Sequence, residues 1–148
     1  VRRVRVGSRD LVVGVSASGT TPFVLAALDE ARRRGAAVTL LTCNPAARPR
    51  GTARAVLDTG PELVAGSTRM KAGAATKMAL ALVSTGAMLR LGKVRAGRMI
   101  EVAPASAKLR RRAVRMVTEL GGVAPRRARA ALERAGWSVR DALEEVER

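Results

Sequence analysis

The stretch Leu11–Cys43, LVVGVSASGTTPFVLAALDEARRRGAAVTLLTC, decides the fold of this chain. An apolar run, Leu11–Ser16, leads into a loop of small residues, and Pro22 stands where the first turn of a helix tolerates proline. The segment after Pro22 places apolar residues on one helical face and charges on the other, until Gly35 ends it. A second apolar run follows. A strand, a helix and a second strand in this order predict a parallel sheet with a right-handed crossover, and hence an α/β fold.

Downstream, the sequence predicts a short third strand at Ala55–Asp58 and a long helix from about Thr68 to Leu91. The long helix is apolar nearly all round, which is typical of a central, buried helix. Residues 96–102 read as a linker or an extended segment. Three further helices are expected at Pro104–Leu120, Pro125–Ala135 and Ser138–Glu147. These patterns predict a sheet-containing part over residues 1–95 and a small helical subdomain over residues 96–148.

The composition limits the chemistry that this chain can perform. It has 148 residues, enough for about one domain, and 47% of them are hydrophobic. It has no histidine and a single cysteine, Cys43, so we predict no disulfide, no metal site and no cofactor. Cys43 ends an apolar run and is interpreted as a small core residue. Only Phe23 and Trp137 are aromatic, which disfavours a base-stacking nucleic-acid platform.

The net charge of +16 has two interpretations. It could mark a surface that binds polyanions, or it could reflect general solubility and an arginine-rich composition of the kind that a GC-rich genome produces. No secretory signal is evident at the start of the sequence, and the longest apolar run, Met78–Val83, is too short to span a membrane. We therefore expect a cytoplasmic protein without membrane contact, for which nucleic acid is a disfavoured partner.

The loop SASGTTP, Ser16–Pro22, has the residue types of an anion cradle. A strand end, a small-residue loop and a helix start bring free N–H groups and the positive helix end to one point. Ser16, Ser18 and Thr21 add hydroxyl groups, and Gly19 lets the backbone approach a ligand closely. The alternative is ordinary capping, in which a serine or threonine hydroxyl only satisfies the helix start.

A second motif, GPELVAGSTRMKAGAATK at Gly60–Lys77, precedes and enters the long helix. Glu62 could accept hydrogen bonds from sugar hydroxyls or from a free helix end. Ser67 or Thr68 could cap the helix. Arg69 and Lys71 lie about 200° apart on a helix, so they are not expected to grip one ligand together.

The two motifs together resemble the second half of the N-acetylmuramic acid 6-phosphate etherase family, within the sugar isomerase (SIS) superfamily of phosphosugar-binding domains. The loop from Ser16 to Thr21 matches the Ser-x-Ser-Gly-x-Thr loop of SIS domains position for position. The second motif is similar to the etherase signature, apart from Ala74, where the family usually has a hydroxyl residue. Asn44-Pro45 and LRLGKV at Leu89–Val94 also match, so that the likeness covers nearly the whole chain.

The resemblance implies a SIS-like (flavodoxin-like) three-layer parallel sheet, present in part and followed by the helical subdomain. It also implies a phosphorylated amino sugar as ligand and a homodimer as the assembly. The implied phosphate-binding residues are Ser16, Ser18, Gly19 and Thr21. The implied sugar-binding residues are Glu62, Ser67, Thr68, Arg69 and Lys71.

The etherases cleave their substrate to N-acetylglucosamine 6-phosphate and D-lactate, with glutamates of the family's first half as acid and base. No glutamate of this chain matches those positions, so we assign no catalytic residue and expect no D-lactate release by this chain alone. Glu62 is assigned to sugar binding or end-capping. We also expect an open sheet edge at the first strand, and therefore a dimer, aggregation or a need for a complementary N-terminal half. The alternatives are a non-catalytic phosphosugar sensor, like the glucokinase regulatory protein, and a basic nucleic-acid-binding module.

Overall fold

A computed structural model describes residues 4–148 of the chain. The elements follow in the order β1 (Leu11–Val15), α1 (Pro22–Arg33), β2 (Ala37–Thr42), β3 (Ala53–Val56), α2 (Lys71–Arg90), β4 (Val94–Arg95), β5 (Arg98–Met99), α3 (Ala107–Gly121), α4 (Pro125–Arg134) and α5 (Val139–Glu147). The chain divides into two compact units between Leu82 and Val83, inside α2. The functional division after residue 95 remains a prediction.

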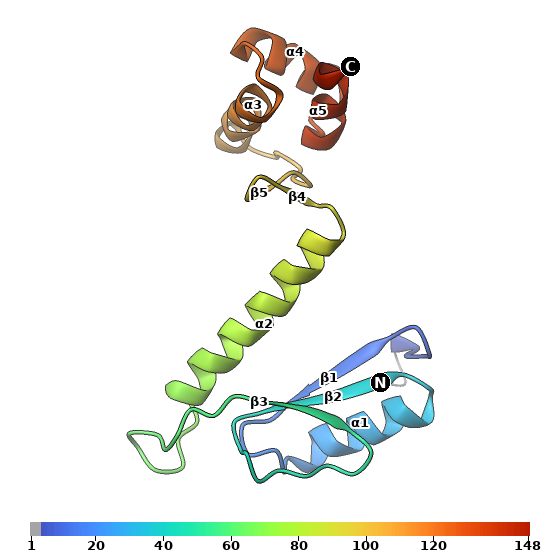
Figure 1. Cartoon of the computed structure of the whole chain (residues 1–148), viewed down its shortest axis with the longest axis vertical. Coiled ribbons are helices and arrows are strands. Elements are labelled where there is room, and N and C mark those ends of the chain that lie inside the picture. Colours follow the sequence, from blue (N-terminus) through green and yellow to red (C-terminus); the bar gives the residue numbers. More distant parts are fainter. Residues whose placement is uncertain (1–3) are drawn as a thin grey trace. The chain divides into compact units, whose positions relative to one another are not determined.

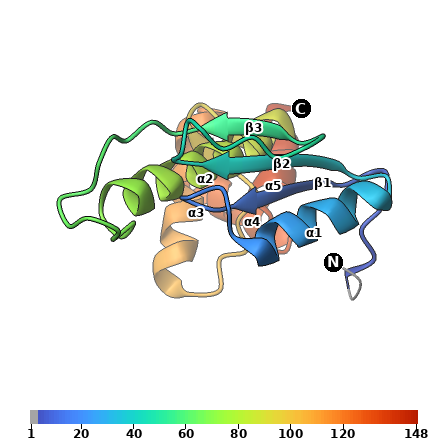
Figure 2. The ribbon, with the colours of Figure 1, turned by 90° about the horizontal axis from the view of Figure 1, so that it is seen from below.

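The first unit contains a three-stranded parallel sheet, in which β2 lies between β1 and β3 (Figure 2). Val13 of β1 pairs with Thr39 of β2, and Thr39 pairs with Ala53 of β3. The strand–helix–strand prediction and the α/β fold class are confirmed. The third strand begins at Ala53, two positions before the start predicted from the sequence.

Helix α1 covers one face of this sheet (Figure 1). Leu28 of α1 is buried with Leu40 of β2 and with Ala47, which follows β2. Gly14 permits this close packing, because a Cβ atom there would lie 2.7 Å from side-chain carbons of both Leu28 and Val24. The core of the first unit is therefore small, and it is built from aliphatic residues.

The opposite face of the sheet is open to solvent. Alternate residues of β1 point to this face, and Leu11, Val13 and Val15 are all exposed. Strand β1 pairs only with β2 among the described residues, so that its other edge is unpaired. One helical layer and the sheet are present, consistent with a partial SIS-like fold.

Helix α2 corrects the expectation of a buried central helix. Ala72 is its one residue classed as buried, whereas Met78 is 66% and Leu82 71% exposed. The physical reason is that no other described helix or strand packs extensively against it. By length and composition alone, α2 could also cross a membrane, a test that core helices of soluble proteins pass as well. The Met78–Val83 run, too short for a span by itself, is only part of this longer apolar helix.

The second unit contains the end of α2 from Val83, the β4–β5 hairpin and a three-helix bundle (Figure 1). The hairpin replaces the expected linker, because Ala96 and Gly97 both adopt positive φ angles and turn the chain. Ser106 and Ser138 cap α3 and α5 by accepting hydrogen bonds from backbone N–H groups, and Gly122 ends α3 in the left-handed conformation. The three predicted helices are thereby confirmed. Their shared core contains Val117, Leu132, Val139 and Leu143.

Candidate functional site

The loop between β1 and α1 closes on itself through its hydroxyl groups. The buried Ser16 Oγ lies 2.8 Å from Thr21 Oγ1 and accepts a hydrogen bond of 3.0 Å from the Gly19 N–H. Ser18 Oγ lies 3.4 Å from Ser16 Oγ and accepts a 3.0 Å hydrogen bond from the Thr20 hydroxyl. The structure therefore brings together all four residues that were predicted to bind phosphate.

The start of α1 is not capped by a side chain. Thr21 occupies the N-cap position in an extended conformation, and its hydroxyl makes no capping hydrogen bond. Pro22 follows and has no N–H group. The loop hydroxyls thus bond to one another instead of capping the helix, which argues against the capping interpretation. The positive end of α1 is left beside a cluster of hydroxyls.

Residues at the end of β2 and just after it hold the loop in place. Ala17 O accepts hydrogen bonds of 3.1 Å from both Cys43 N and Thr42 Oγ1. Asn44 Nδ2 donates to Ser18 O at 2.9 Å. The sequence indicated Asn44 only as part of a family match and did not predict this role for it. The signal available was its place at the carboxyl end of the neighbouring parallel strand, which lies at the same sheet edge as the loop.

Gly19 is required by the geometry of this contact. Its φ angle is +72°, and a Cβ atom there would lie 2.5 Å from Ala47 Cβ and 3.0 Å from Thr42 Oγ1. Ala47 Cβ is fixed by the backbone and cannot rotate away. The loop backbone therefore sits closer to the segment after β2 than any residue with a side chain would allow.

Glu62 caps α2. Its Oε2 accepts a 3.0 Å hydrogen bond from Lys71 N, and its Oε1 accepts one of 3.0 Å from Ala72 N. These backbone hydrogen bonds, first the one from Ala72 and then the one from Lys71, hold the pKa of the Glu62 carboxyl below its ordinary value. Of the two uses considered for Glu62, the structure displays the helix-end contact.

Capping by Ser67 or Thr68 is wrong, because α2 begins at Lys71 and its first free N–H groups bond to Glu62. Ser67 is half-buried, whereas Thr68 and Arg69 are exposed. The Lys71 ammonium donates to Pro61 O at 2.9 Å, so that it braces the turn before the helix. A sugar-binding role for Ser67, Thr68, Arg69 and Lys71 stays a prediction.

The loop and the start of α2 meet the same segment. Cys43 N bonds to Ala17 O, and Cys43 Sγ lies 3.9 Å from Ala72 O. Ala72 N in turn bonds to Glu62. Cys43 is half-buried at this junction, consistent with a packing role. Among residues 4–148, no group of three His, Cys, Asp or Glu side chains is placed to hold a metal ion.

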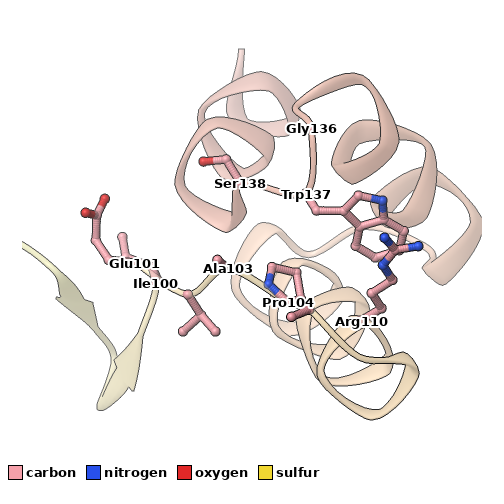
Figure 3. A pocket seen from close by; sticks show the side chains of 10 residues that line it. Ile100, Glu101, Ala103, Pro104, Arg110, Gly136, Trp137 and Ser138 are labelled. Atoms are coloured by element: carbon pink, nitrogen blue, oxygen red, sulfur yellow. The ribbon is translucent and has the colours of Figure 1, made fainter.

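A hollow of about 550 Å³ lies in the second unit, between Ile100–Ala105 and the Trp137 turn (Figure 3). It shares no residue with the loop or with the Glu62 cap. The assignment of the candidate site therefore follows the hydroxyl and backbone geometry at Ser16–Thr21, because phosphate recognition depends on donors more than on cavity size.

Replacing Glu62 by glutamine should lower the melting temperature of the chain by a few degrees at pH 7, because α2 loses a charged cap. Since the pKa of Glu62 is depressed in the folded state, its contribution is present above the ordinary glutamate value and is lost as the pH falls through the lowered pKa. The gap between Glu62→Gln and the parent chain should therefore close in acid. Thermal melts followed by circular dichroism measure both effects.

The matched control is Asp29→Asn, which removes an exposed carboxylate paired with Arg32 on α1. Such surface pairs contribute little to stability. Equal melting temperatures for the two variants at pH 7 would contradict the capping role of Glu62.

The chain has close relatives among curated proteins, although no protein-family model matches it. It is 50% identical over 143 residues to a protein of Symbiobacterium thermophilum named N-acetylmuramic acid 6-phosphate etherase, covering 95% of this chain and 47% of the relative. A protein of the same name from Rubrobacter xylanophilus is 47% identical over 95% of this chain and 48% of its own length. A third, from Thermosynechococcus vestitus, is 46% identical over 94% of this chain and 46% of its own length. The chain thus spans about half the length of the curated relatives it matches.

Proposed function

We propose that this chain, a homologue of the N-acetylmuramic acid 6-phosphate etherases over about half of their length, is the phosphosugar-binding part of an etherase-type lyase. The observation that carries the proposal is the cluster of the Ser16, Ser18 and Thr21 hydroxyls beside an uncapped helix start. Hydroxyl donors, the positive helix end and the close backbone at Gly19 together suit a phosphate group. The names of the relatives supply the sugar, a phosphorylated amino sugar.

The phosphate should dominate the affinity. N-acetylglucosamine 6-phosphate is expected to bind at least about a hundredfold more tightly than N-acetylglucosamine, because two or more charge-assisted hydrogen bonds of roughly 1.5–3 kcal/mol are lost with the phosphate. Isothermal titration calorimetry measures both affinities. Ser18→Ala should weaken phosphosugar binding, whereas Thr52→Ala, which removes a hydroxyl elsewhere in the first unit, should not. Equal affinity for the two sugars would refute the phosphate-loop assignment.

The chain alone should release no D-lactate from N-acetylmuramic acid 6-phosphate. Abstraction of a proton from carbon needs a base whose pKa is raised toward neutrality, whereas the carboxyl beside the α2 entrance, Glu62, has its pKa lowered by two backbone hydrogen bonds. An enzymatic lactate assay on the purified chain measures this. Robust turnover that disappears in Glu62→Gln would overturn the binding-only assignment of this carboxylate.

The two backbone hydrogen bonds that hold Glu62 at the start of α2 favour one alternative, a non-catalytic phosphosugar sensor. A carboxylate committed to a helix end can link ligand binding to the position of α2 without any chemistry. The two functions separate experimentally: a sensor binds the phosphosugar and never supports lactate release, even when mixed with a polypeptide equivalent to the other half of an etherase. For either function we propose a cytoplasmic location and a homodimer or a complementary half as partner.

A further inference from the structure

Four basic residues of α3 gather on one side of the helix. At 100° per residue, their positions fall within an arc of about 100°. All four are exposed, and the apolar residues of α3 face the bundle core on the other side. We call this set the basic stripe; it consists of Lys108, Arg111, Arg112 and Arg115.

The basic stripe contrasts with those cations of the second unit that are paired with carboxylates. Elsewhere Arg95 pairs with Glu147 at 2.7 Å and Arg140 with Glu101 at 2.7 Å, while Arg134 pairs with Glu145. Within residues 4–148, three members of the stripe form no ion pair with a carboxylate. The fourth, Arg115, approaches Glu119 only to 4.0 Å, and Glu119 is already paired with Arg98.

The surface around the stripe is hollowed. The four cations and Leu109 line a depression of about 570 Å³. A second depression of about 310 Å³ continues onto α4, where Arg111 and Arg129 share it with Trp137 and with one carboxylate residue, Glu133. Arg110 also lines this second depression, with its guanidinium carbon 4.7 Å from the centre of the Trp137 ring (Figure 3). Cations therefore predominate on a face that runs from α3 to α4, where the Arg110 guanidinium lies over the Trp137 ring.

We propose that this face binds the phosphate backbone of single-stranded nucleic acid without sequence preference. Positive side chains at i, i+3, i+4 and i+7 present a row of charges about 5–6 Å apart, which suits a chain of regularly spaced phosphates. Arg110 and Trp137 offer one stacking surface for a base. The contacts proposed for the stripe go to phosphates, and phosphate contacts carry no sequence information.

A membrane surface and a compositional bias both account for the stripe less well. A membrane-surface helix needs apolar side chains exposed beside its cations, whereas those of α3, such as Met116 and Val117, are buried in the bundle. Compositional bias accounts for the number of arginines in the chain. It does not account for the placement of four cations on one arc of α3, opposite the apolar face of that helix.

The test is fluorescence polarisation of a labelled 20-nucleotide DNA single strand, titrated with the full chain between 50 and 200 mM salt. The altered protein is Arg111→Ala/Arg112→Ala/Arg115→Ala. The matched control is Arg32→Ala/Arg33→Ala/Arg34→Ala at the C-terminal end of α1, which removes the same charge from residues paired with Asp29 and Glu30. Circular dichroism verifies that both proteins fold, and vesicles of anionic phospholipid serve as a competing surface.

We expect the α3 triple variant to bind at least tenfold more weakly than the parent chain and the α1 triple variant to bind like the parent. The slope of log affinity against log salt should become shallower by about 2 in the α3 variant alone, since each phosphate contact on a single strand contributes about 0.7. If both triple variants bind the DNA equally weakly, the affinity depends on the net charge of the chain and not on this face, which would overturn the proposal. Absence of binding at 50 mM salt, or preference for the vesicles, would overturn the proposal.

Discussion

Gly19→Ala is expected to abolish phosphosugar binding and to lower the stability of the chain by about 2–5 kcal/mol. A non-glycine residue at a φ of +72° costs roughly 1–2 kcal/mol, and a Cβ placed 2.5 Å from Ala47 Cβ adds an overpacking cost of roughly 1–3 kcal/mol. The loop must move to relieve the contact. Because the Gly19 N–H donates a hydrogen bond to Ser16 Oγ, that movement also displaces the proposed phosphate donors.

Gly35→Ala provides the control for the backbone contribution. Gly35 has a φ of +84°, but a Cβ atom there would meet only Ser8, at 3.6 Å or more, which is ordinary contact. This variant should lose only the stability that a non-glycine residue at positive φ costs, and it should bind the phosphosugar normally. Calorimetry at a temperature where both proteins are folded, with thermal melts alongside, distinguishes the two. Retained affinity in Gly19→Ala would show that the loop is not the phosphate site.

Local features of the sequence predicted most of the elements because their signals lie within a few residues. Pro22 and Gly35 bound α1, Gly122 ends α3, and the alternation of apolar runs with helical periodicity predicted the parallel sheet. The proximity of the loop hydroxyls was also predictable, since these residues lie within six positions of one another between a strand end and a helix start. The four predicted loop residues are indeed neighbours in the structure.

Features that depend on distant contacts were harder to infer. Glu62 lies nine positions before Lys71, beyond the usual spacing of a capping residue, so that its pairing with the α2 end was only one of two options. Burial of α2 was inferred from its apolar composition. Composition shows that a helix has apolar surface to bury, but it does not show whether another helix or strand packs against that surface. The spacing of the basic residues along α3 can be read from the sequence. Which cations pair with carboxylates cannot, because Glu147 of α5 and Glu101 after the hairpin pair with Arg95 and Arg140, which are distant from them in the sequence.

The uncovered side of the sheet favours association of the isolated chain. Parallel sheets normally have both faces covered and each inner strand paired on both edges. Here β1 offers an unpaired edge among the described residues and an exposed apolar face, and α2 exposes apolar residues over most of its length. An edge of this kind is a template for pairing with another chain, and the apolar area beside it stabilises such contact.

Light scattering should therefore show dimers or larger assemblies of the isolated chain at concentrations on the order of tens of micromolar. Val13→Lys should shift the population toward monomer, because a charge on the open face of β1 opposes association at that edge. Val56→Lys on β3 is the matched control: Val13 is 38% and Val56 36% exposed, and both lie on edge strands. If the two lysine variants dissociate the assembly equally, association does not proceed through β1. If the parent chain is a stable monomer at these concentrations, the open sheet does not cause association at all.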